Sequence, residues 1–221
     1  MFQQILDLWN KYSYVFINGL IGTLGLAALT VLAATVLGTL IAIMKLSKIL
    51  VLDVITSAYI AVLRGTPILL QLYFFWLILP KILPFELSDT SSIIIALIIN
   101  SSSYVAEIIR AGIQAVDKGQ VEAARSLGMT AVNTMKKIVL PQAVKNILPA
   151  LGNEYINMVK QTSLASVFFV PELMTSYKTV QSATFLAIPP LIIVGAIYLV
   201  VTAVLSKGLN LFERRLQRNE A

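Results

Sequence analysis

Polar side chains recur at helical spacing within two otherwise apolar stretches of the chain. The first set is Asn100, Ser103, Glu107, Arg110 and Gln114, and the second is Glu154, Asn157 and Gln161. Steps of three and four residues keep each set on one face of a helix. If the two faces meet, their polar groups would line a path that hydrogen-bonds and charge-pairs with a solute. Hydrogen bonding between helices is the favoured alternative for any single Asn or Ser, whereas Glu154 is expected to face a solute or a positive partner.

The residue types that are missing limit the chemistry further. The chain has no cysteine and no histidine, which excludes disulfides, thiolate nucleophiles and imidazole proton relays. It also contains no G-x-x-x-x-G-K-[ST] phosphate-binding loop, so it is not expected to hydrolyse ATP unaided. We therefore predict no catalytic residue, no metal site and no cofactor bound by this chain.

The apolar composition of the chain predicts which kind of element positions these residues. Hydrophobic residues make up 57% of the 221-residue chain, charged residues make up 13%, and the mean hydropathy is +0.83. Such values predict an all-α integral membrane protein that forms one transmembrane domain over residues 1–221. The net charge of +6 is attributed to membrane orientation because the basic residues flank apolar runs, and no nucleic-acid partner is expected.

Five apolar runs of the sequence are long enough to cross a bilayer, which takes about 20 helical residues. They cover about residues 14–44, 50–79, 91–114, 148–170 and 185–205. Ahead of the first run, Phe2, Ile5, Leu6 and Trp9 share one helical face, which suits a short helix lying in the membrane interface. Five spans place the two termini on opposite sides of the membrane.

The distribution of lysine and arginine predicts which side each terminus faces. Twelve of the 17 basic residues follow span one, separate spans three and four, or follow span five. They are Lys45, Lys48, Arg110, Lys118, Arg125, Lys136, Lys137, Lys145, Lys207, Arg214, Arg215 and Arg218. The opposite side carries Lys11, Lys81 and Lys178. By the positive-inside rule, the N-terminus lies outside and the C-terminus is cytoplasmic.

The segment 115–143, between spans three and four, is expected to form two helices on the cytoplasmic side. Asp117 suits the N-cap of a first short helix, and Gly128 can end that helix through a left-handed conformation. Thr130 can then cap a second helix, which Pro141 is expected to break or redirect. An ordinary loop is the alternative, but connections of about 30 residues are uncommon, and this favours a docking surface.

The same segment resembles the EAA loop of the membrane subunits of ATP-binding-cassette (ABC) importers. Glu122, Ala123 and Ala124 are followed after three residues by Gly128 and after nine more by Ile138–Pro141, which matches that loop without departure. The stretches "RGTP" at 64–67 and "NSSSYVAEIIRAGIQAV" at 100–116 are similar to the branch that imports polar amino acids, the histidine and glutamine permease type. The resemblance extends over about residues 14–215.

This resemblance implies a type I ABC importer permease fold and a role in the ATP-driven import of polar or basic amino acids, in the inner membrane of a prokaryotic cell. The implied partners are two cytoplasmic ATPase subunits that carry ATP and Mg, a second permease subunit in a homodimer or heterodimer, and an extracytoplasmic solute-binding protein. By the same resemblance, ATP binding opens the path outward and hydrolysis resets it. The residues implied to contact the ATPase are Glu122, Ala123, Ala124 and Gly128.

Two further features inside the predicted spans have open interpretations. Arg64, Gly65 and Pro67 place a charge and a helix break within span two, either as a hinge or as a kink that accommodates a neighbour. Arg64 is also one candidate partner for Glu154, a transported cation being the other. Span one carries a row of small residues, which predicts a packing face within the subunit or against a second copy. The row is Thr30, Ala34, Gly38 and Ala42.

Other classes of membrane protein fit the sequence less well. An ion-coupled secondary amino acid transporter is the main alternative, but five spans without a detectable inverted repeat disfavour it. An ion channel would need a selectivity filter, and the sequence shows no repeated carbonyl or charge-ring segment. A membrane enzyme would need a nucleophile with its base or a metal cluster, and neither His nor Cys is available.

Overall fold

The computed structural model describes residues 1–47 and 49–218, with side chains as far as residue 216. Over this part of the chain nine α-helices follow one another, and no strand occurs among the described residues. The prediction of an all-α fold is confirmed. Lys48 and the side chain of Arg218, which both enter the predicted charge distribution, lie outside the described residues.

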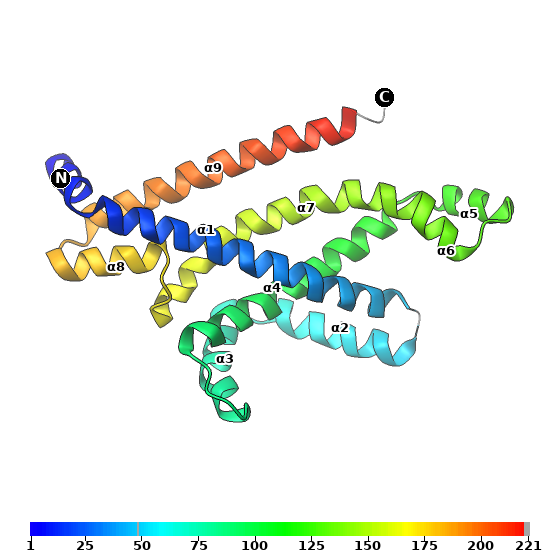
Figure 1. Ribbon diagram of the computed structural model, residues 1–221, viewed down its shortest axis with the longest axis horizontal. Helices are drawn as coiled ribbons and strands as arrows, with labels where there is room; N and C mark the ends of the chain where they lie inside the picture. The colour runs from blue at the N-terminus through cyan, green and yellow to red at the C-terminus, as the bar shows by residue number, and fades with distance from the viewer. Residues whose placement is uncertain (48, 219–221) are drawn as a thin grey trace.

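The helices form an elongated bundle with the following bounds. The first six are α1 Phe2–Leu46, α2 Leu50–Gly65, α3 Ile68–Ile82, α4 Asp89–Gln114, α5 Lys118–Ser126 and α6 Ala131–Thr134. The rest are a π-helical turn Met135–Val139, α7 Leu140–Gln161, a 3-10 segment Thr162–Phe168, α8 Leu173–Thr184 and α9 Ile188–Arg218. In Figure 1, α1, α7 and α9 run along the long axis, with the N-terminus and α8 toward one end and α5 and α6 toward the other.

Three of the described helices, α1, α4 and α9, are long and apolar enough to cross a membrane. The pair α2 and α3 would supply a fourth crossing if it forms one span, but its axes are bent by 109° at the break. The break falls at Gly65 and Pro67, as the sequence indicates. With 22 residues α7 is also long enough to span, but its polar side chains lower its hydropathy.

Several boundaries differ from those that the sequence predicts. The expected interfacial helix is continuous with the first span, because α1 begins at Phe2. The helix that contains the fourth run begins at Leu140, and the end of that run is the 3-10 segment. Helix α8 is absent from the sequence-based scheme because it is short and polar, with Glu172 as its N-cap. The helix that contains the fifth apolar run consequently begins at Ile188.

The row of small residues on α1 packs against α4 within the subunit. All four members are buried, and Ala34 and Ala42 share an apolar cluster with Val105 of α4. A Cβ atom added at Gly38 would lie 2.8 Å from Val105 Cβ and 2.9 Å from the carbonyl oxygen of Ser102. The helices therefore approach closely at this glycine, which settles the open choice in favour of packing inside the subunit.

A polar cluster joins α1, α8 and α9 at the end of the molecule that carries the N-terminus. The Glu172 carboxylate accepts hydrogen bonds from the backbone N–H of Thr175 at 2.5 Å and from the Tyr198 hydroxyl at 3.1 Å. The backbone N–H of Leu173 donates to Thr23 Oγ1 on α1 at 3.0 Å. Burial raises the pKa of the Glu172 carboxyl, and the hydrogen bonds that it accepts oppose this rise.

Gly38→Ala is expected to destabilise the protein, because the added methyl group has no room at the contact between α1 and α4. Overpacking of this kind costs about 1–3 kcal/mol, which would lower the melting temperature of the detergent-solubilised protein followed by tryptophan fluorescence. Gly25→Ala is the matched control, since nothing lies within 4 Å of a Cβ added there. Equal melting temperatures for the two variants would contradict the close approach of α1 and α4.

Candidate functional site

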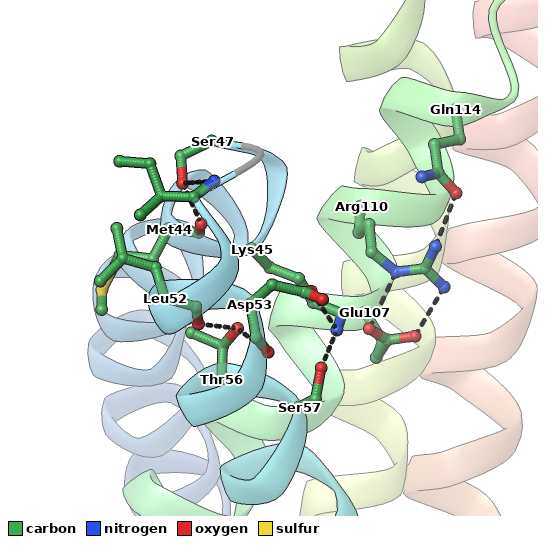
Figure 2. A network of polar contacts seen from close by, with 11 residues as sticks. Met44, Lys45, Ser47, Leu52, Asp53, Thr56, Ser57, Glu107, Arg110 and Gln114 are labelled. Atoms are coloured by element: carbon green, nitrogen blue, oxygen red, sulfur yellow. Dashed lines mark hydrogen bonds and ion pairs between the residues drawn. The ribbon is translucent and has the colours of Figure 1, made fainter.

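The later part of the predicted polar stripe on α4 is a ladder along the helix (Figure 2). The Arg110 guanidinium donates to both carboxylate oxygens of Glu107, at 2.9 and 2.8 Å, and to Gln114 Oε1 at 2.6 Å. Beside it, Lys45 of α1 forms an ion pair with Asp53 of α2 at 3.3 Å. These groups satisfy one another, which favours a structural role over contact with a solute.

Arg64 belongs to this charged group and lies apart from Glu154. Its guanidinium is 3.8 Å from Glu107 Oε2, and it lies over the Tyr104 ring at 5.2 Å from the ring centre. The Arg64 side chain is 45% exposed, so this ion pair contributes little to stability. In the structure Arg64 therefore pairs with Glu107 and does not neutralise Glu154.

Glu154 is a buried carboxylate on the side of α7 that faces α4. The residue is 6% exposed, and its Oε1 accepts a hydrogen bond from Ser101 Oγ at 2.9 Å. Ser101 is not a member of the predicted stripe, and the serine run 101–103 is the one sequence signal that points to it. Among the described residues, no cation forms an ion pair with Glu154.

Asn100 and Ser103, which are predicted to share a path with Glu154, make other contacts. Asn100 Nδ2 donates to Gln71 Oε1 on α3 at 2.8 Å, and the Ser103 hydroxyl donates to the Asn100 carbonyl at 2.7 Å. Both side chains are buried. Asn100 thus joins α4 to α3, while Ser103 bonds its own helix.

The second predicted stripe is divided between two sides of α7. Glu154 is buried, whereas Asn157 is exposed, together with Asn153 and Lys160. Gln161 is partly buried, and its Oε1 has no hydrogen-bond partner among the described residues. An exposed polar face on a helix at membrane depth needs water or another subunit beside it.

The segment 115–143 forms the predicted helix, elbow and second helix. Asp117 caps α5 by accepting from two backbone N–H groups at 2.6 and 3.3 Å, and Thr130 caps α6. Gly128 has a φ of +85°, the left-handed conformation that favours glycine. Pro141, by contrast, does not break the second helix. The π-helical turn Met135–Val139 carries the chain into α7, where Pro141 lies in the first turn and its missing N–H is tolerated.

The outward surface of α5 overlaps only partly with the contact set that the sequence implies. Glu122, Ala123 and Gly128 are exposed, but Ala124 is 5% exposed and packs inward. Leu127 is 86% exposed next to the elbow. Sequence reasoning did not identify Leu127, because an apolar residue at that spacing is equally compatible with a buried position.

Apolar spanning helices, a polar exposed face on α7 and a capped helical loop beyond the bundle define a membrane permease of the type I ABC importer fold. The chain belongs to the family described as binding-protein-dependent transport system inner membrane component, whose model matches residues 34–218. The sequence-based resemblance is thereby confirmed.

Individual relatives are similar over almost the whole chain. The arginine transport system permease protein ArtQ of Bacillus subtilis is 38% identical, with 92% of this chain and 93% of the relative covered. The probable glutamine ABC transporter permease protein GlnM of the same organism is 37% identical, with 96% and 97% covered. A crystal structure of an amino acid ABC transporter with histidines has a TM-score of 0.90 at 48% identity, over 96% of this chain and 98% of that one. The inward-facing MetNI methionine ABC transporter, at 16% identity and a TM-score of 0.72 over 92% and 97%, shares the fold.

Proposed function

We propose that this chain is the membrane-spanning subunit of an ATP-driven importer of polar and basic amino acids in the inner membrane of a prokaryotic cell. The similarity to arginine and glutamine permeases over nearly the full length carries this proposal. The structural likeness to an amino acid ABC transporter supports it. In this assembly the chain provides the path, while partner ATPase subunits bind and hydrolyse ATP with Mg.

The complete transporter contains two permease subunits, two ATPase subunits and an extracytoplasmic solute-binding protein. The family description supports the binding protein. The exposed face of α7 supports the second permease, whether identical or closely related. Asn153, Asn157 and Lys160 would face a second copy across a water-filled path, since an exposed polar face in lipid is unfavourable.

Five spans with the N-terminus outside fit this assembly. In this scheme α7 supplies the crossing that hydropathy alone does not identify. The end of α1, the segment from α5 through the π-helical turn, and the end of α9 lie toward one end of the molecule, away from the N-terminus and α8 (Figure 1). Nine of the 17 basic residues occur in these segments, namely Lys45, Lys118, Arg125, Lys136, Lys137, Lys207, Arg214, Arg215 and Arg218, which supports a cytoplasmic location for that end.

Glu154 gives the path a preference for positive charge in this proposal. A buried carboxylate that has one hydroxyl partner, Ser101, is costly without a cation. The α-ammonium group of an amino acid, or the guanidinium of arginine, would supply the missing charge during passage. Of the other candidates, Asn157 is exposed and Gln161 has an unbonded oxygen, whereas Asn100 and Ser103 are engaged within the subunit.

Contacts within the subunit support a route by which motion of the ATPase would reach the path. Arg125 donates to the Met129 carbonyl at 2.6 Å across the elbow. Gln142 Nε2 of α7 donates to Gln120 Oε1 of α5 at 2.6 Å. A displacement of α5 by the ATPase would therefore be passed to α7, the helix that carries both Glu154 and the exposed polar face.

Uptake of radiolabelled arginine and glutamine into vesicles that contain the complete transporter tests the proposed function. We expect uptake with ATP, Mg and the binding protein in the absence of any ion gradient. Uptake driven by an ion gradient without ATP would favour the alternative, an ion-coupled secondary amino acid transporter, in which Glu154 would be the ion site.

Glu154→Gln is expected to reduce arginine uptake about tenfold more than glutamine uptake, because one lost charge interaction is worth about 1.4 kcal/mol or more. The amide oxygen can still accept the hydrogen bond from Ser101, so the complex should remain assembled. Ser101→Ala is the matched control, since it removes the hydrogen bond and keeps the charge. Equal loss of both substrates in Glu154→Gln would contradict contact with the guanidinium, because glutamine has the same α-ammonium group as arginine but no side-chain charge.

Leu127→Asp is expected to weaken association with the ATPase about tenfold, because burying a leucine side chain contributes about 1.5–3 kcal/mol to an interface. Co-purification of the ATPase with the permease measures the effect. Leu127→Met keeps the apolar contact and should behave as wild type. If Leu127→Asp retains the ATPase as wild type does, the docking surface does not include the tip of α5.

Single cysteines can test the orientation without background labelling, because the native chain has no cysteine. Cysteine in place of Lys81 or Ser182, both exposed, should react with a membrane-impermeant maleimide added outside intact cells. Cysteine in place of Lys136, also exposed, should react only after the membrane is opened. Labelling of position 136 from outside would show that the topology is the reverse of the proposed one and that the segment 115–143 is not cytoplasmic.

A further inference from the structure

The break between α2 and α3 leaves a backbone carbonyl without its usual helical donor. In a continuous α-helix, the oxygen of Leu63 would accept from the backbone N–H of residue 67. Residue 67 is a proline, which has no N–H, and Thr66 is extended with φ −120° and ψ 148°. At membrane depth an unpaired carbonyl costs several kcal/mol.

The side chain of Gln71 takes the place of the missing donor. Its Nε2 lies 2.8 Å from the Leu63 carbonyl oxygen, 3.2 Å from the Thr66 carbonyl oxygen and 2.8 Å from Thr66 Oγ1. The residue belongs to the first turn of α3 and is 7% exposed. A single amide therefore bonds the end of α2 from the start of α3, across the bend of 109°.

Asn100 fixes the orientation of that amide from a third helix. Its Nδ2 donates to Gln71 Oε1 at 2.8 Å, and Asn100 is 3% exposed. This contact requires the Gln71 oxygen to face α4, which leaves the Gln71 nitrogen facing the carbonyl groups of the bend. If the Gln71 amide were reversed, two oxygens would face each other at Leu63 and at Thr66.

The two arms do not pack against each other inside the bend. A cavity of about 610 Å³ lies between the two arms, lined by Tyr59 and Val62 of α2, Thr66 at the break, and Leu70 and Phe74 of α3 among others. Each arm packs instead on α4: the Tyr59 hydroxyl of α2 donates to the Ile99 carbonyl at 3.1 Å, and buried Leu72 of α3 lies in an apolar cluster with Ile93 and Leu97. The Gln71 amide joins the two arms across the bend, and Asn100 bonds that amide to α4.

We propose that Gln71 and Asn100 form an amide clamp that sets the angle between α2 and α3 and transmits the position of α4 to this bend. Both are positioning residues for transport. The structural part of the proposal stands on the contacts above, and its consequence for transport rests on the proposed function. In this proposal Asn100 affects the path indirectly, because it helps to set the angle between α2 and α3.

A distance between the two arms tests the clamp without any substrate. Spin labels on cysteines that replace Val54 of α2 and Ile78 of α3, both exposed, would report the bend in the assembled transporter, with labelled subunits diluted by unlabelled ones. Asn100→Asp preserves the shape of the side chain but cannot donate to Gln71 Oε1. Gln71→Met preserves length and burial but removes every bond to the break. Each variant is expected to broaden or shift the distance distribution.

Ser103→Ala is the matched control, because Ser103 is buried on the same helix and bonds only its own backbone. It should keep the wild-type distribution. In uptake assays with arginine, Asn100→Asp and Gln71→Met should each lower the maximal rate about tenfold, as expected for a buried hydrogen bond. The double variant should be no worse than the single ones, since both remove the same clamp.

Wild-type distance distributions in both Asn100→Asp and Gln71→Met would overturn the clamp, whatever the transporter carries. Altered distributions with unchanged maximal uptake would overturn its role in transport alone. If either variant fails to assemble, the other provides the same test. If wild-type vesicles take up neither arginine nor glutamine with ATP, the proposed function fails, while the distance measurement still tests the clamp.

Discussion

The requirement that polar groups find partners away from water governs this structure. A bilayer offers no solvent to an unpaired carbonyl, amide or charge, so each one has to be satisfied by the protein or has to border a water-filled space. Most intramembrane polar groups here are satisfied by other groups of the protein. Arg110 and Glu107 pair along α4, and Gln71 bonds the carbonyls that the break exposes. The Gln71 bonds join α3 to α2, and the ion pair of Lys45 with Asp53 joins α1 to α2.

The groups that do not follow this pattern indicate where the function lies. Glu154 is buried with one hydroxyl partner, Gln161 retains an unbonded oxygen, and the neighbouring face of α7 exposes Asn157 and Lys160. Glu154 and Gln161 both belong to α7, while Thr30 Oγ1 on α1 is the other buried side-chain atom without a hydrogen-bond partner among the described residues. Helix α7 begins at the π-helical turn and is bonded to α5 through Gln142, so the segment 115–143 and the candidate path are connected through α7.

Local signals in the sequence predicted local structure well. The caps at Asp117 and Thr130 and the left-handed Gly128 depend on neighbouring residues alone, and all three are confirmed. Helical periodicity placed Asn100 and Glu154 on inward faces but could not identify their partners, Gln71 and Ser101. Those partners depend on how α3 and α7 lie against α4, which no spacing along one helix encodes. The prediction that Pro141 breaks the second helix was wrong. A π-helical turn leads into α7, and Pro141 falls in the first turn of α7, where a proline is tolerated.

Water access to the exposed face of α7 is the most direct test of this account. Cysteines at Asn153, Asn157 and Lys160 would be treated with a small water-soluble thiol reagent in the assembled transporter, with Leu199 of α9, 71% exposed, as a lipid-facing comparison. The account predicts rapid reaction at the three α7 positions, changing in rate when ATP is added, and no reaction at position 199. Unreactive cysteines along α7, with or without ATP, would show that this face borders lipid or protein, and the proposed path would have to lie elsewhere.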